Sequence, residues 1–256
     1  MKKHLTSFTT LVIAAALIFS TLQLSTATAA EEQKTVLITG ANRGLGLEFA
    51  RKFQARGYRV IGTARDPAAA EELKALGVRV EQLDVADTGS ARALAERLGG
   101  AGIDILINNA GIFGTNSRSL AELEVDKLNE AFAVNSIGPL RVTQALLENL
   151  RHGRDKKIIN ISTVMASISG NTGGVYAYHA SKAALNSIGK SLAGELGREG
   201  FIVVMIHPGW VRTDMGGPTA PLSPEESIGA ILKLIDGLKA EDNGRFMDYQ
   251  GQTVPW

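Results

Sequence analysis

The fold is decided by one stretch of sequence, Thr35-Val36-Leu37-Ile38-Thr39-Gly40-Ala41-Asn42-Arg43-Gly44-Leu45-Gly46. Its β-branched, apolar beginning predicts a buried strand, and the glycines after it predict a tight turn. A helix over residues 44–56 is then indicated by Leu45, Phe49 and Phe53 at helical spacing. The free N–H groups at the start of such a helix can bind a phosphate. An ordinary strand-to-helix turn is the alternative, since the spacing is GxxxGxG and not the more general GxGxxG.

Alternating strands and helices continue along the chain. The apolar runs predict strands over 59–63, 78–83, 103–107, 157–161 and 202–206, and helices over 67–76, 90–98 and 175–198. This spacing predicts βαβ units, in a doubly wound parallel sheet of the Rossmann type with helices on both faces. Residues 216–224 are loop-like, but a helix follows at once. We therefore predict a single α/β domain over residues 31–256.

Composition excludes several classes of protein. Of the 256 residues 45% are hydrophobic, which is enough to bury a core and argues against disorder. The formal net charge of +1 gives no reason to expect nucleic acid as a partner. The chain has no Cys, which excludes disulfides and thiolate ligands, and its four His form no HExxH motif. We therefore expect no metal.

The first thirty residues have the composition of a secretory signal peptide. Lys2 and Lys3 supply positive charge, residues 11–19 are an unbroken apolar run, and Ala27-Thr28-Ala29 offers a cleavage site. The apolar run is too short to span a bilayer comfortably. We predict a signal peptide over 1–30 and export to the periplasm or medium. The alternative is an N-terminal extension that keeps the protein in the cytoplasm or stays as an uncleaved anchor.

Two arginines bear on the choice of cofactor. A cofactor with a free 2′-hydroxyl is usually held by an acidic residue at the end of the second strand, where this chain has Arg65. Arg43 in the glycine turn can reach the same place. Two guanidinium groups suit a 2′-phosphate, so the sequence favours NADP(H) over NAD(H). Asp66 is adjacent, and the alternative is that both arginines are ordinary solvated side chains.

Tyr178 and Lys182 are four residues apart near the start of the long helix, so they share one face. A Tyr hydroxyl with a pKa near 10 is a poor acid–base group at neutral pH. A nearby ammonium would stabilise the phenolate and lower that pKa. The pair is therefore a candidate catalytic site.

Taken together, these motifs resemble those of the short-chain dehydrogenase/reductase family, over residues 34 to 256. The resemblance rests on residues 39–46, Asp84, Asn108-Asn109-Ala110-Gly111, Asn135, Tyr178 with Lys182, and Pro208-Gly209 followed by Thr213. Residues 207–217, Ala220-Pro221-Leu222 and the segment from Asp248 to Trp256 are similar to the carbonyl reductase and C-factor-like subgroup.

The resemblance implies a role for each matching residue. Tyr178 would donate or accept the proton, Lys182 would tune it and bind the nicotinamide ribose, and Asn135 would hold a water linked to Lys182. The implied cofactor-binding residues are Gly40, Asn42, Arg43, Gly44, Leu45, Gly46, Arg65, Asp84, Val85, Asn108, Ala110, Gly111, Tyr178, Lys182, Pro208, Gly209, Val211 and Thr213.

The catalytic hydroxyl that the family places after the fifth strand has more than one candidate. Counting along the strand favours Thr163, with Ser162 one residue early and Ser167 as a remote third. One step along a strand reverses the side chain, so only one of Thr163 and Ser162 can face the cleft.

Two functions fit these features. The first is an NADPH-dependent oxidoreductase that transfers hydride between nicotinamide and the carbonyl or alcohol of a small molecule. The second is a non-enzymic NADP-binding protein used in signalling or sensing. Loops near 112–119, 167–175 and 216–222 are expected to form the substrate pocket. A homo-oligomer paired through helix 175–198 is compatible with the sequence.

Overall fold

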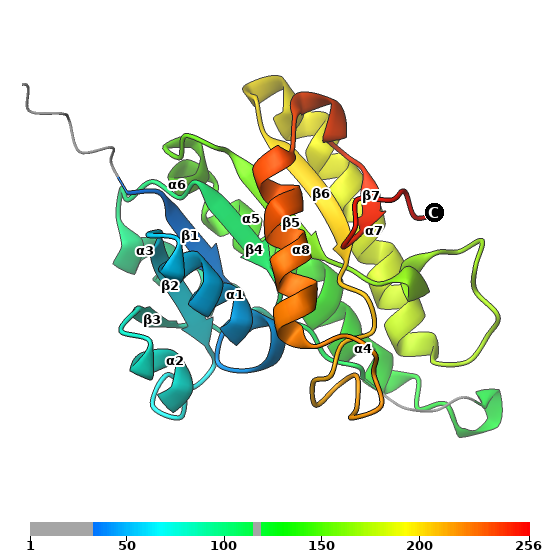
Figure 1. The fold of residues 1–256 in the computed structure, drawn as a ribbon. Coiled ribbons are helices and arrows are strands. Elements are labelled where there is room, and N and C mark those ends of the chain that lie inside the picture. The colour runs from blue at the N-terminus through cyan, green and yellow to red at the C-terminus, as the bar shows by residue number, and fades with distance from the viewer. Residues whose placement is uncertain (1–32, 115–118) are drawn as a thin grey trace, which may run out of the picture. The chain divides into compact units, whose positions relative to one another are not determined.

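The computed structural model describes residues 33–114 and 119–256 (Figure 1). The predicted signal peptide lies outside the described residues. A seven-stranded sheet with the order β3-β2-β1-β4-β5-β6-β7 forms the centre, and every neighbouring pair is parallel. Its strands are β1 (Thr35–Ile38), β2 (Arg59–Ala64), β3 (Arg79–Gln82), β4 (Ile105–Asn108), β5 (Lys157–Ile161), β6 (Ile202–His207) and β7 (Phe246–Asp248). The predicted doubly wound parallel sheet is confirmed.

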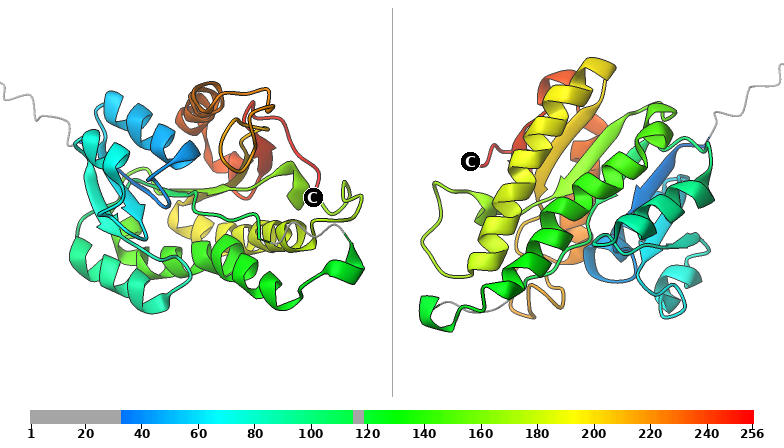
Figure 2. Two further views of the ribbon diagram at one scale, coloured as in Figure 1. Left: turned by 90° about the horizontal axis from the view of Figure 1, so that it is seen from below. Right: turned by 180° about the vertical axis from the view of Figure 1, so that it is seen from behind.

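Helices cover both faces of the sheet (Figures 1 and 2). One face packs against α1 (Gly44–Ala55) and α8 (Pro224–Gly237). The other packs against α3 (Thr88–Leu98), α5 (Gly138–Ala145), α6 (Leu147–Arg151) and α7 (Tyr176–Leu196). Successive strand residues supply the two cores: Val36 and Ile38 face α1, and Leu37 faces the opposite layer. Among the described residues, no helix has the length and apolar character needed to cross a membrane.

Two helical segments differ from the sequence prediction. The helix expected over 67–76 is only α2 (Glu71–Ala75), because the Asp66 carboxylate accepts a hydrogen bond from the Ala68 amide (2.8 Å) and turns the chain. A continuous helical run lies between β4 and β5, a stretch to which the sequence analysis assigned no element. It includes α4 (Asp126–Phe132), a π-helical turn (Ala133–Ile137) and α5. π-Helical turns occur frequently at functional sites, and this one contains Asn135.

The strand order fixes where a ligand can bind. β1 pairs with β2 on one side and with β4 on the other, so the chain changes direction of winding between β1 and β4. In open α/β sheets, ligands bind beyond the carboxyl ends of the strands at such a point. The glycine turn after β1 and residues 108–111 after β4 meet there.

Candidate active site

The glycine turn is held closely against the segment after β4. Gly40 has φ +62°, and a Cβ on it would meet the Cα of Ala110 at 3.0 Å. A Cβ on Gly46 would fall 2.2 Å from the main-chain oxygen of Gly40, so only glycine lets α1 begin this close to the turn. The first turn of α1 contains no acidic residue, and its N-cap, Arg43, makes no side-chain capping bond. This N-terminus fits the pyrophosphate of a dinucleotide.

Thr39 and Asn109 tie the two segments together, and neither was among the predicted site residues. The Thr39 hydroxyl accepts hydrogen bonds from the amides of Asn109 and Ala110, both at 3.0 Å. The Asn109 side-chain amide donates to the main-chain oxygens of Thr39 (2.9 Å) and Gly40 (3.0 Å). The side chain of Asn108, which is predicted to line the cofactor cleft, is buried and donates to Asn160 Oδ1 (2.9 Å).

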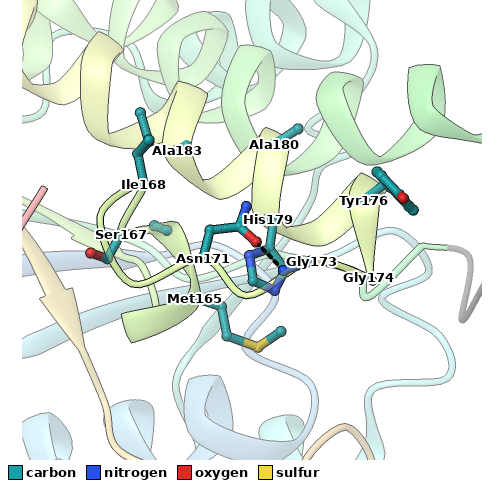
Figure 3. A pocket seen from close by; sticks show the side chains of 11 residues that line it. Met165, Ser167, Ile168, Asn171, Gly173, Gly174, Tyr176, His179, Ala180 and Ala183 are labelled. Atoms are coloured by element: carbon teal, nitrogen blue, oxygen red, sulfur yellow. Dashed lines mark hydrogen bonds between the residues drawn. The ribbon is translucent and has the colours of Figure 1, made fainter. Parts of the chain in front are cut away.

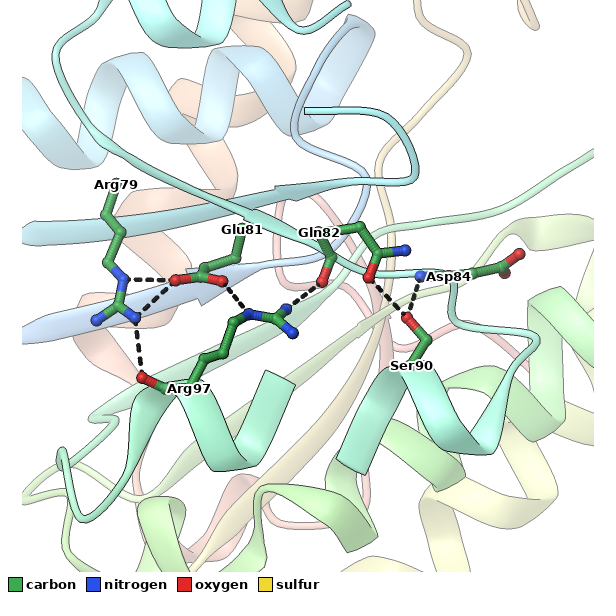
Figure 4. A network of polar contacts seen from close by, with 6 residues as sticks. All are labelled: Arg79, Glu81, Gln82, Asp84, Ser90 and Arg97. Carbon is green, nitrogen blue, oxygen red and sulfur yellow. Dashed lines mark hydrogen bonds and ion pairs between the residues drawn. The ribbon is translucent and has the colours of Figure 1, made fainter. Parts of the chain in front are cut away.

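Hydrogen bonds hold Asp84 and Val85, the residues that follow β3. Asp84 accepts a bond from the Ala86 amide (2.9 Å), and its carboxylate points away from the neighbouring network of Arg79, Glu81 and Arg97 (Figure 4). The Val85 main-chain oxygen accepts from Arg141 Nη1 at 2.5 Å. These contacts hold Asp84 and Val85, two of the cofactor-binding residues that the family resemblance implies. Arg65 directly follows β2 and is exposed.

Tyr178, Lys182 and Asn135 lie in the interior at the start of α7. Lys182 is 4% exposed, and its Nζ donates to the main-chain oxygen of Ile161 (2.8 Å) and lies 6.0 Å from the centre of the Tyr178 ring. Asn135 is fully buried and exchanges hydrogen bonds with the main chain of Ile112, both at 2.9 Å. A Cβ on Gly111 would lie 3.3 Å from Asn135 Oδ1 and 3.5 Å from Lys182 Nζ. Gly111 therefore lies against both side chains.

The three candidate hydroxyls after β5 have different surroundings. The Thr163 hydroxyl lies near Tyr178, whose pKa it lowers, and it accepts a hydrogen bond from the Met165 amide (3.2 Å). Ser162 faces the opposite way, and its hydroxyl donates to Asn186 Oδ1 (2.7 Å) in the buried layer under α7. Ser167 is bonded to Ser169 and to the main-chain oxygen of Trp256. Only Thr163 is therefore placed to act together with Tyr178.

Burial raises the pKa of Tyr178 and lowers the pKa of Lys182 from their ordinary values. Burial raises the pKa of Tyr178 to about 12, and the nearby Thr163 hydroxyl lowers it only in part. Burial also lowers the pKa of Lys182 to about 8. The Lys182 ammonium donates to the Ile161 oxygen, and burial has the largest effect on the pKa of the Tyr178 phenol.

Apolar side chains surround the Tyr178 hydroxyl. The Phe113 ring stacks on the Tyr178 ring with centroids 4.8 Å apart, and the hydroxyl donates to Met215 Sδ at 3.8 Å. Met215 belongs to the loop after β6, in which the Trp210 indole N–H donates to the Gly216 oxygen (2.7 Å). Trp210 and Met215 are half exposed. A molecule that reaches Tyr178 therefore passes aromatic and thioether groups.

The loop after β6 also reaches the glycine turn. The Thr213 methyl would lie 3.7 Å from a Cβ on Gly44. Gly209 has φ +82°, and a Cβ there would clash with Leu222 at 2.4 Å. Val211 is buried against Leu222, and Pro208 accepts a bond from Ser227 in α8 (2.6 Å). The loop after β6 thus lies near the glycine turn at Thr213 and contacts Tyr178 at Met215.

The fold and this site define a dinucleotide-binding α/β protein with a buried tyrosine and a buried lysine at the start of α7. Residues 34–221 match the short chain dehydrogenase family, and the chain belongs to it. The C-signal protein of Myxococcus xanthus is 46% identical over 166 residues, which cover 64% of this chain and 99% of that protein.

Solved structures of carbonyl reductases have a similar fold. The carbonyl reductase Sniffer of D. melanogaster has a TM-score of 0.82 at 33% identity, covering 88% of this chain and 100% of its own. An NADPH-bound carbonyl reductase from chicken fatty liver has a TM-score of 0.81 at 34% identity, covering 88% and 99%.

Proposed function

We propose that this chain is an NADPH-dependent carbonyl reductase in which Tyr178 donates the proton. The observation that carries the proposal is the burial of Tyr178 beside the buried Lys182, whose Nζ lies 6.0 Å from the centre of the phenol ring. A phenol with its pKa raised to about 12 stays protonated at neutral pH, which suits reduction of a carbonyl. The chicken relative is bound to NADPH, which supports the choice of cofactor.

The residues around the cleft fit this cofactor. The N-terminus of α1 would hold the pyrophosphate, and Arg43 and Arg65 the 2′-phosphate. Asp84 and Val85 would lie near the adenine, and Lys182 near the nicotinamide ribose. When bound, NADPH supplies a hydride to the carbonyl carbon.

The chain's own groups orient and polarise the substrate. Thr163 and Tyr178 donate hydrogen bonds to the carbonyl oxygen, and Tyr178 gives its proton as negative charge develops there. Lys182 and Asn135 both lie beside Gly111, and Lys182 Nζ is 6.0 Å from the centre of the Tyr178 ring, so we assign them the resupply of the proton. Phe113 and Met215 exclude water, so the substrate expected is a small neutral aldehyde or ketone.

The test is reductase turnover of residues 31–256. We expect loss of NADPH absorbance with a panel of aldehydes and ketones, and a loss of turnover in Tyr178→Phe with cofactor binding retained. Unchanged turnover in Tyr178→Phe would contradict the mechanism.

A signalling protein that binds NADP without turnover is the second candidate. The 46% identity to the C-signal protein favours it. The two are distinguished by comparing the wild type with Tyr178→Phe in a signalling assay: a non-enzymic role survives the loss of the phenol, and an enzymic one does not.

We also propose that the chain is exported and that its mature form begins near Ala30 or Glu31. The support is the charged, apolar and small-residue order of residues 1–30. Sequencing the N-terminus of protein isolated from its host tests this, and an intact Met1 on soluble cytoplasmic protein would contradict it.

A further inference from the structure

A cavity of about 580 Å³ opens beside the segment that follows Thr163 in the chain. Its wall begins at Val164 and Met165, immediately after Thr163, and continues to His179 on α7. Val254 and Pro255 close another side. A second hollow of about 300 Å³ adjoins it and shares Met165 and His179 (Figure 3). Two of the residues that line the hollows have ionisable side chains, the His179 imidazole and the Tyr176 phenol.

Segment 164–174 forms the wall common to both hollows. Ala166 packs in the core against Met205, Phe246 and Val254, but the segment makes few long-range hydrogen bonds. Within the described part of the chain, its hydrogen bonds mostly join neighbours at most three residues apart. It enters α7 through Val175, a β-branched residue with φ +45° in the left-handed region. Such a backbone persists only where the surroundings hold it.

Trp256 supplies the long-range anchor. Its main-chain oxygen accepts hydrogen bonds from the Ser169 amide (3.1 Å), the Ser169 hydroxyl (2.9 Å) and the Ser167 hydroxyl (3.3 Å). Ser167 in turn accepts from the Gly170 amide (3.2 Å). Three donors on one oxygen fix the first half of the segment relative to Trp256.

The ring of Trp256 is itself fixed to the core. Its centroid lies 5.6 Å from that of Phe246, which is 1% exposed in β7. Lys190 Nζ lies 5.8 Å from the centre of the indole and also donates to the Gly244 oxygen (3.1 Å). The sheet therefore holds the indole, and the oxygen of the same residue holds the wall of the cavity.

We propose that Trp256 is a positioning residue that determines substrate specificity, by holding segment 164–174 as the wall of a subsite beside Thr163. This subsite takes the uncharged, apolar part of the carbonyl substrate remote from the reacting carbon. The inference rests on the proposed reductase function.

The test compares a small aldehyde with a bulky aromatic ketone. Trp256→Ala removes the ring anchor, so the KM for the ketone should rise about tenfold, while its kcat and the KM for the aldehyde stay within about twofold. Trp256→Phe keeps an aromatic ring against Phe246 and should restore most of the ketone KM.

The double variant Ser167→Ala/Ser169→Ala should likewise raise the KM for the ketone. Ser191→Ala is the matched control, because its hydroxyl bonds only within α7. Equal changes for both substrates, or none, would overturn the proposal.

Hydrogen exchange separates this inference from the proposed function. Amides of segment 164–174 should exchange faster in Trp256→Ala than in the wild type or Trp256→Phe. Unchanged exchange would overturn the role of Trp256 even if the protein proved inactive. Absence of turnover in the wild type, with faster exchange in Trp256→Ala, would contradict the reductase function and leave the positioning role standing.

Discussion

Arg43 and Asp214 form an ion pair, with Nη1 and Oδ2 2.9 Å apart, between the glycine turn and the loop after β6. Both side chains are largely exposed, at 71% and 79%. Asp214 precedes Met215, whose sulfur accepts from the Tyr178 hydroxyl. The guanidinium that we propose for the 2′-phosphate is thus also paired with the loop whose Met215 contacts the Tyr178 hydroxyl.

Removing this competitor should favour the cofactor. We expect Asp214→Asn to tighten NADP(H) binding about twofold to fivefold, because exposed ion pairs contribute little and Arg43 becomes free for the phosphate. Titration at low and high salt measures the effect, which should shrink as salt screens the charges. Asp236→Asn is the control, since Asp236 pairs with Arg56 at 2.9 Å away from the cleft. Weaker binding in Asp214→Asn would show that the pair assists the site.

Arg65 should discriminate between the two dinucleotides. Its charge-assisted contact with a 2′-phosphate is expected to contribute about 1.5–3 kcal/mol, so Arg65→Ala should weaken NADP(H) binding and leave NAD(H) binding nearly unchanged. Dissociation constants for both cofactors measure this, with the exposed Arg92→Ala on α3 as the control. An equal loss for both cofactors would mean that Arg65 does not recognise the phosphate.

Strong local patterns made the fold predictable. The buried runs of β1, β2, β5 and β6 are rich in β-branched residues, and their positions agree with the prediction to within a residue. β7 has only three residues, and its place in the sheet depends on pairing with β6, which no local pattern shows. The helix that contains Asn135 includes a π-helical turn, which breaks the regular spacing.

The site was predictable where strand alternation applies. Alternation along the strand places the side chains of Thr163 and Ser162 on opposite faces, but it does not show which one faces the cleft. The packing of α7 on β5 decides that. The roles of Thr39 and Asn109 depend on contacts about seventy residues apart, for which the only signal was their place at strand ends. The pKa of Tyr178 depends on burial by Phe113 and Met215, which spacing does not show.

Thr163 and Ser162 should separate activity from stability. Thr163→Val keeps the shape of the side chain but removes the hydroxyl, so kcat should fall by about 10²–10³, as for a lost oxyanion donor. Ser162→Ala should keep kcat and lower the free energy of unfolding by about 1–3 kcal/mol, because Asn186 Oδ1 loses its buried donor. Steady-state kinetics and urea unfolding measure both. The reverse pattern would assign the catalytic hydroxyl to Ser162.

Burial of Lys182 should appear in the pH dependence of stability. Its pKa falls from 10.5 in the unfolded chain to about 8 in the fold, so between these values the unfolded chain binds more protons and stability rises with pH. Tyr178 acts in the opposite sense at higher pH, because its pKa rises from 10.0 to about 12 and stability falls across that range. Lys182→Met should remove the rise between pH 8 and 10, whereas Lys233→Met on the exposed side of α8 is the control for a lost surface lysine. Urea unfolding at a series of pH values measures each curve. If the wild type and Lys182→Met run parallel from pH 8 to 10, Lys182 is not held in the desolvated position that the proposed proton transfer needs.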